Sequence, residues 1–196
     1  MPHDTRREPH VAPPSARARQ LIEALGLVPH PERGFYAETY RAPARVVSRQ
    51  HAGERSASTA IYFLICDPER ATFLHRLRSD EVFHLYEGGP LDVLRLSPDR
   101  SWDVARLGLA VEAGERPQLL LPAGTWFGTE LAPGASHCLI GCTVAPGFEF
   151  EDFELDQGQL PALYPEAAER IARLERPRPE QRPQTSSGME KTPSIR

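Results

Sequence analysis

Residues 75–88 read H-R-L-R-S-D-E-V-F-H-L-Y-E-G, and they are the most informative part of the chain for its architecture. The segment carries two histidines, two arginines and the adjacent carboxylates Asp80 and Glu81. Residues 81–86 read as a strand, and Glu-Gly-Gly-Pro at 87–90 predicts a hairpin turn into a second strand at 91–96. Chemically active side chains therefore gather at the start of a β-hairpin.

Short apolar or alternating runs recur along the rest of the chain, with turn signals about every ten residues. Further strands are expected at 35–40, 59–66, 102–107, 118–121, 126–131, 138–144 and 148–155. This spacing favours an antiparallel sandwich, barrel or jelly roll over alternating strand–helix units. A first helix is expected from Ser15, as its N-cap, to Gly26, and a second at about 161–174.

The folded region is expected to be one domain covering residues 15–175. Residues 1–14 and 176–196 combine prolines with charged side chains and offer few apolar groups for burial. We therefore expect two disordered tails.

The chain has 196 residues, a net charge of -4 and a pI of about 6.0, which argues against a general nucleic-acid-binding surface. No apolar run approaches the roughly 18 residues that span a membrane. The N-terminal segment lacks the apolar core of a secretory signal, and the three cysteines read as reduced thiols. We therefore expect a cytoplasmic protein without a membrane partner. The only lysine is Lys191, which argues against Schiff-base chemistry in the folded region.

Two segments resemble the two motifs of the cupin superfamily. In 75–88, His75, Glu81 and Gly88 match the first motif, although Leu77 stands where the motif has its second histidine. Pro-Ala-Gly-Thr-Trp at 122–126 resembles the second motif, but Phe127 occupies its histidine position. The resemblance implies an all-β, cupin-type antiparallel jelly-roll barrel with short N-terminal and C-terminal helices, which holds a small molecule inside.

Residues 21–155 resemble one cupin subfamily more closely, the subfamily described as predicted sugar epimerases. The shared motifs are P-E-R-G-F-Y at 31–36, S-T-A-I-Y-F-L at 58–64 and the run from Gly141 to Leu155. Arg33 stands where the subfamily has the first of two glycines, and Phe127 where a polar residue is expected. The resemblance implies a sugar or nucleotide as ligand and a homodimer that pairs through an outer sheet.

Typical cupins hold iron, manganese or nickel with three histidines and one carboxylate. Here Leu77 and Phe127 replace two of those histidines. His84 is a substitute, but it lies three residues from Glu81 and faces the other side of a regular strand. His137 is a further histidine outside the motifs. We therefore expect no metal cofactor. A divalent metal, if one binds, would be held by His75, Glu81 and His84.

The resemblance to sugar epimerases implies that a proton next to a carbonyl is removed and returned on the other face. Such a reaction needs a base, an acid and a group that stabilises the enolate. His75 is predicted to be the base, because histidine titrates near neutral pH. Glu81 or Asp80 would orient it, and Tyr86 or Tyr36 would donate a proton. In the alternative interpretation, His75 and Glu81 form a buried structural pair.

The predicted catalytic residues are His75, Glu81 and Tyr86. The predicted substrate-binding residues are Tyr36, Glu38, Arg76, His84 and Trp126. Arg76 would hold an anionic group of the ligand, and Trp126 would either pack in the core or line the pocket.

Three functions are therefore compared. The first is a metal-independent epimerase or isomerase that acts on a sugar or sugar nucleotide. The second is a metal-dependent dioxygenase or decarboxylase, against which the missing histidines speak. The third is a module that binds a small molecule without catalysis.

Overall fold

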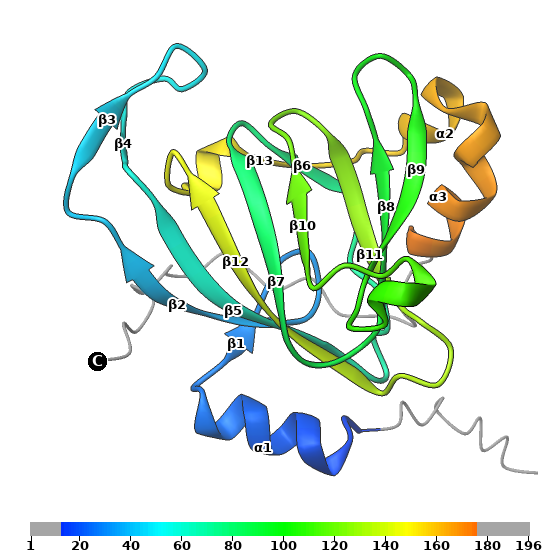
Figure 1. Ribbon diagram of the computed structural model, residues 1–196. Coiled ribbons are helices and arrows are strands. Elements are labelled where there is room, and N and C mark those ends of the chain that lie inside the picture. Colours follow the sequence, from blue (N-terminus) through cyan, green and yellow to red (C-terminus); the bar gives the residue numbers. More distant parts are fainter. Residues whose placement is uncertain (1–12, 176–196) are drawn as a thin grey trace, which may run out of the picture.

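The structure is a computed structural model that describes residues 13–175, and these residues form a β-barrel of two antiparallel sheets (Figure 1). The first sheet contains, in spatial order, β1 (Val28–Pro29), β2 (Phe35–Arg41), β5 (Thr59–Cys66), β12 (His137–Ala145), β7 (Asp80–Gly88) and β10 (Gln118–Leu121). The second contains β13 (Phe153–Leu155), β6 (His75–Leu77), β11 (Trp126–Leu131), β8 (Leu91–Leu96) and β9 (Trp102–Leu107). A separate hairpin pairs β3 (Arg45–Val47) with β4 (Glu54–Ser56). The predicted all-β jelly roll is confirmed.

The strands alternate in the way that a half-buried sheet requires, because successive side chains on a strand point to opposite faces. Phe63, Phe83, Val93, Phe127 and Ile140 point between the sheets and form the main core. Each of them is at most 4% exposed. Burial of such a side chain stabilises the fold by about 1.5–3 kcal/mol, so this alternation determines which face of each strand points inward.

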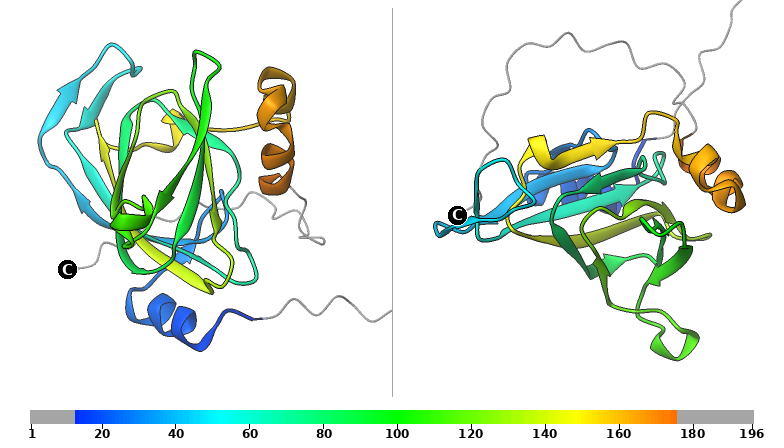
Figure 2. Two further views of the ribbon diagram at one scale, coloured as in Figure 1. Left: turned by 45° about the vertical axis from the view of Figure 1, so that its right-hand side comes forward. Right: turned by 90° about the horizontal axis from the view of Figure 1, so that it is seen from above.

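Helices cover the outer faces of both sheets (Figure 2). Helix α1 (Ala16–Ala24) packs on the six-stranded sheet, and the Ser15 hydroxyl caps it by accepting from the Ala18 amide. The C-terminal helical elements pack on the five-stranded sheet and are α2 (Leu160–Leu163), the 3-10 turn η3 (Pro165–Ala167) and α3 (Ala168–Leu174). The predicted single helix at 161–174 is broken at Pro165, where a ring replaces the amide hydrogen that a continuous helix needs. Another 3-10 turn, η1 (Val111–Ala113), follows β9.

The prediction of a strand at 148–155 is wrong over most of that range. Only β13 is a strand there, and it is preceded by a 3-10 turn, η2 (Phe150–Asp152). Arg55 on β4 donates to the Asp152 carboxylate, with Nε 2.6 Å from Oδ2, and both side chains are buried. This ion pair turns Asp152 inward, which a regular strand with an outer charged face would not allow.

Arg33 has a φ of 78°, the left-handed region that favours glycine. Its side chain compensates with tertiary contacts that glycine lacks. The guanidinium lies 3.7 Å from the Phe73 ring centroid and donates to the carbonyl of Leu174, the last residue of α3. Arg33 thus connects the loop before β2 with the C-terminal helix.

The disordered tails predicted at 1–14 and 176–196 lie outside the described residues, except for residues 13 and 14. Among residues 13–175, the helices are too short and too polar to cross a membrane.

Candidate functional site

A cavity of about 300 Å³ opens between the two sheets. Its walls come from β2, β5, β7 and β12 of one sheet, from β6 and β13 of the other, and from the segments before β2 and before β13. The lining residues with polar or titratable side chains are His30, Glu32, Tyr36, Glu38, Arg41, Thr59, His75, Glu81, Cys142 and Glu149. The lining therefore brings three buried ionisable side chains, Glu32, His75 and Glu81, to one cavity.

The innermost charges are a buried ion pair between Glu32 and His75. His75 Nε2 lies 2.9 Å from Glu32 Oε2. Its other ring nitrogen, Nδ1, lies 2.9 Å from the Phe73 carbonyl oxygen, which can only accept, so Nδ1 carries a hydrogen. Both nitrogens of His75 are therefore occupied, and His75 presents no lone pair to the cavity while the ion pair exists.

The pKa values of these two groups are shifted in directions that favour the ion pair. Burial alone would raise the pKa of Glu32, but the positive charge of His75 and the hydrogen bond from it, together with the effect of His30 in its protonated form, outweigh burial and hold the pKa below its ordinary value. Burial alone would lower the pKa of His75, but the charge and hydrogen bond of Glu32, with the Phe73 carbonyl, raise it. Both shifts favour the charged forms, a Glu32 carboxylate beside a His75 imidazolium.

Glu81 on β7 is in the opposite state. Burial raises its pKa to about 8, and the negative charge of Glu32 contributes in the same direction. The charge of His75 and a hydrogen bond with the Cys142 thiol oppose this shift and lower the pKa, but burial outweighs them. Glu81 therefore holds its proton at pH 7, while Glu32 has lost its own.

His30 lies in an aromatic setting beside this pair. Its ring is 4.7 Å from that of Tyr36 and 5.6 Å from that of Phe63, centroid to centroid. Burial lowers the pKa of His30 and outweighs the opposing effect of Glu32. The Glu32 amide donates to His30 Nδ1 at 3.4 Å. His30 is therefore neutral, with its hydrogen on Nε2.

At the mouth of the cavity, Arg41 on β2 binds two carboxylates. Its guanidinium makes a two-pronged contact with Glu38, at 2.9 and 2.7 Å, and donates to Glu149 at 2.7 Å. It also donates to the Phe148 carbonyl at 3.2 Å. These bonds hold the segment that carries Phe148 and Phe150 against β2.

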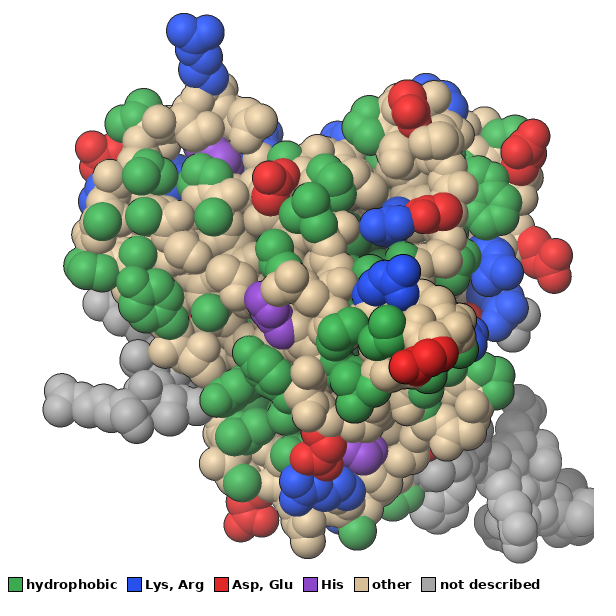
Figure 3. Space-filling view, in the orientation of Figure 1, with side chains coloured by type: hydrophobic (Ala, Val, Ile, Leu, Met, Phe, Trp, Pro, Cys, Tyr) green, Lys and Arg blue, Asp and Glu red, His purple; other side chains and the backbone are tan. Residues whose placement is uncertain are grey.

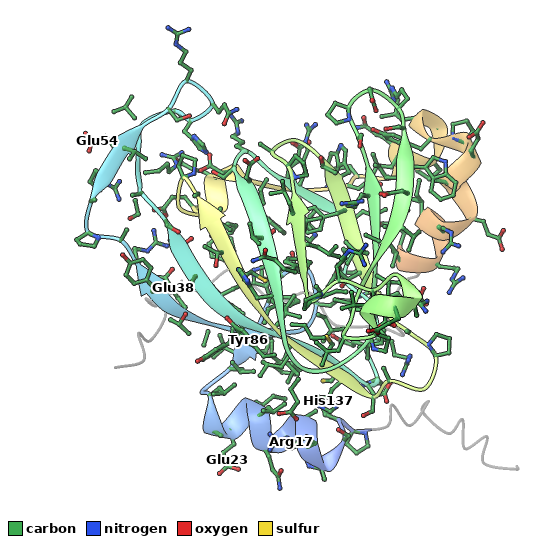
Figure 4. All side chains as sticks on the ribbon, in the orientation of Figure 1. Arg17, Glu23, Glu38, Glu54, Tyr86 and His137 are labelled. Atoms are coloured by element: carbon green, nitrogen blue, oxygen red, sulfur yellow. The ribbon has the colours of Figure 1, made fainter. Side chains whose placement is uncertain are left out.

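Four of the predicted site residues line this cavity: Tyr36, Glu38, His75 and Glu81. Tyr86 and His84 do not, because they point to the outer face of β7. Tyr86 is 56% exposed and lies over Gly141, where a Cβ atom would meet its hydroxyl oxygen at 2.1 Å. Figure 4 shows Tyr86 towards the end of the barrel next to α1. His84 Nδ1 and Nε2 bond to Gln118 and Thr143 on neighbouring strands.

Arg76 and Trp126 also lie outside the cavity. Arg76 points away from its neighbour His75, binds Glu154 at 2.7 Å and lies over the Trp126 ring. Trp126 packs with the C-terminal helical elements. His137, the further histidine, contacts Glu87 near α1.

The lining does not fit the metal centre of typical cupins. Phe127 packs its ring 4.2 Å from that of His75, centroid to centroid, in the place of a second imidazole ligand. Within residues 13–175, no three His, Cys, Asp or Glu side chains are grouped so that they could hold a metal ion. The groups available for chemistry in the cavity are therefore its own acids and bases.

Sequence reasoning missed the roles of Glu32, His30 and Arg41. Glu32 belongs to the P-E-R-G-F-Y motif at 31–36, which marked the segment without indicating a function. Glu32 and His75 are 43 positions apart along the chain, and no local pattern relates them.

An antiparallel jelly roll with polar groups in its interior cavity defines the cupin class of proteins. The chain belongs to the cupin superfamily and, within it, to the family DUF985, whose sequence profile matches residues 19–156. Two solved structures share this architecture. A hypothetical protein from Leishmania major is 36% identical and has a TM-score of 0.74. The match covers 80% of this chain and 97% of that protein. Protein SO0799 from Shewanella oneidensis is 38% identical, with a TM-score of 0.73 and coverage of 98% of that chain and 82% of this one.

A curated relative is the uncharacterized protein YML079W of Saccharomyces cerevisiae. It is 28% identical over 163 residues, which are 77% of this chain and 80% of the relative. None of these names states a reaction, so the likeness establishes the family and the fold.

Proposed function

We propose that the chain binds a small polar molecule in the barrel cavity and epimerises it by proton transfer at a carbon next to a carbonyl group. The observation that carries the proposal is the pair Glu32 and Glu81, two carboxyl groups that face one cavity in opposite protonation states. Cavities in which the environment separates the pKa values of two such groups commonly use one as base and the other as acid.

In this reaction the Glu32 carboxylate removes the proton from the carbon, and the electrons of the C–H bond form the enolate. The imidazolium of His75, which has lost the negative charge of its partner, then stabilises the negative enolate. Glu81 gives its proton to the same carbon on the opposite face. Exchange with solvent afterwards removes the proton from Glu32 and returns one to Glu81.

This proposal changes the predicted role of His75. It becomes a positioning residue and a counter-charge, because both of its ring nitrogens are already bonded. The base is Glu32. Tyr86 has no role in this mechanism, since its side chain is on the outer face of β7.

The test is deuterium incorporation from D2O into a panel of aldoses, ketoses and their UDP derivatives, followed by NMR. The wild-type protein is expected to exchange one C–H of its substrate, and Glu32→Gln and Glu81→Gln are each expected to slow exchange at least 100-fold. Glu112→Gln, an exposed carboxylate outside the cavity, is the matched control. Binding of a panel member with no incorporation would instead identify a binding module.

A further inference from the structure

Five phenylalanine and tyrosine rings contribute to the walls of the cavity. Phe148, Phe150 and Phe153 come from one segment, and Phe148 and Phe150 pack edge to face with centroids 5.1 Å apart. Tyr36 and Phe63 also line the cavity, and their rings lie 4.7 and 5.6 Å from that of His30, centroid to centroid. Such rings present apolar faces to a flat or ring-shaped ligand. The volume of about 300 Å³ is at the lower end of the range for ligand pockets.

The charged groups that line the cavity are paired with one another. At the mouth, the Nε and both terminal nitrogens of Arg41 are used by Glu38, Glu149 and the Phe148 carbonyl. In the interior, the charges of His75 and Glu32 offset each other.

The remaining titratable groups of the lining are neutral. Glu81 is protonated because it is buried next to Glu32, and His30 is uncharged among aromatic rings. The Cys142 thiol is also uncharged, because burial holds its pKa well above the ordinary value. Among the described residues, the cavity therefore offers no unpaired cation to a ligand, and each of its carboxylates is already bonded to Arg41 or His75.

We infer that the cavity selects an uncharged, ring-sized ligand of the monosaccharide class and rejects phosphorylated forms, sugar nucleotides included. A phosphate that bound Arg41 would have to detach it from two carboxylates and then remain beside them, which like charges oppose. A cationic ligand would have to compete with Arg41 or His75 for carboxylates that are already paired. This inference rests on the proposed function, of which it names the substrate class.

The test compares binding of neutral and charged probes to the full-length protein by titration calorimetry and NMR. The neutral probes are D-glucose, D-galactose, D-fructose, L-rhamnose and D-xylose. The anionic probes are glucose 6-phosphate, UDP and UDP-glucose, and choline is the cationic probe. We expect at least one neutral sugar to bind about tenfold or more tightly than any charged probe.

The double variant Glu38→Gln/Glu149→Gln leaves Arg41 without its carboxylate partners. It is expected to gain affinity for UDP and glucose 6-phosphate by about tenfold. Glu149→Gln alone is a second variant in case the double variant does not fold, and a smaller gain in the same direction is expected from it.

Tighter binding of a phosphorylated probe or of choline to the wild-type cavity would overturn the inference. So would binding of no neutral sugar, or an unchanged preference in a folded Glu149→Gln variant. Failure of the proposed function looks different, because a neutral sugar would bind and its C–H would not exchange. A phosphorylated probe that binds and exchanges would contradict the inference alone.

Discussion

Replacement of Glu81 by glutamine should make the protein more resistant to alkaline pH. The folded protein keeps the Glu81 proton up to a pKa of about 8, whereas the unfolded chain releases it near 4.5. Between these values the unfolded state binds fewer protons, so the free energy of unfolding of the wild type falls as pH rises. Glutamine has nearly the same shape and does not ionise, so the variant lacks this loss.

The magnitude follows from the shift. A change from 4.5 to about 8 is roughly 3.5 pKa units, which corresponds to about 5 kcal/mol if the whole shift is expressed. The charges of Glu32 and His75 titrate in the same cavity, so we expect a gain of several kcal/mol for the variant over wild type between pH 4.5 and 9. That is a large part of the roughly 5–15 kcal/mol that stabilises a domain.

The assay is urea unfolding of the wild type, Glu81→Gln and Glu112→Gln at half-unit intervals from pH 4.5 to 9. Glu112→Gln controls for the removal of one negative charge from the surface. An infrared carbonyl band of a protonated carboxyl at pH 7, absent from Glu81→Gln, would support the assignment directly. Parallel stability profiles of wild type and Glu81→Gln over this pH range would refute the reasoning.

The remaining predictions concern the other contacts described above. Glu32→Gln leaves the buried His75 without its partner and should destabilise the protein by about 3–5 kcal/mol. This loss should be largest between about pH 4.5 and 6.5. The raised pKa of His75 stabilises the wild type at low pH, and this contribution is lost as the pH rises. The lowered pKa of Glu32 stabilises it at higher pH, and this contribution is lost as the pH falls. NMR titration should also show a lower His75 pKa in that variant, and an unchanged value would contradict the ion pair. Arg33→Ala should lose about 1–3 kcal/mol in thermal unfolding and be less stable than Arg33→Gly, which relieves the positive φ; the reverse order would refute the strain argument. Elemental analysis should find no stoichiometric iron, manganese, nickel or zinc, and dialysis against a chelator should leave the melting temperature unchanged. A bound metal would instead favour the metal-dependent dioxygenase or decarboxylase. The predicted homodimer would use the outer face of the six-stranded sheet, which shows few charged side chains over its middle in Figure 3. Tyr86→Glu on that face should shift the mass in light scattering from dimer to monomer without changing ligand binding, and a monomeric wild type would contradict the homodimer.

Counting positions along β7 predicts which of its side chains face the cavity. Glu81 and His84 are an odd number of residues apart, so period-two alternation already predicts opposite faces. The same rule applies to Tyr86, which is five positions from Glu81, and it would have excluded Tyr86 from the cavity. The structure adds that β7 has a bulge at this point. Leu139 of β12 pairs with Glu87, and the next residue, Ile140, pairs with Leu85, so Tyr86 has no partner in the register.

The segment 148–155 is a case in which local pattern was misleading. Its alternating aromatic and acidic residues have the period of a strand with a solvated charged face. In the protein Arg55 pulls Asp152 inward and Arg41 holds Glu149. Two arginines that are distant in sequence therefore convert this segment into a wall of the cavity.

The amino-acid sequence by itself determined the jelly-roll class, the positions of most strands and the inward direction of Glu81, because these depend on local alternation and turn residues. The tertiary structure decided that Glu32 pairs with His75, that Glu81 remains protonated, and that Arg41 lies between two carboxylates. These properties depend on burial and on distances between charges that are far apart along the chain, and neither quantity exists until the two sheets have packed.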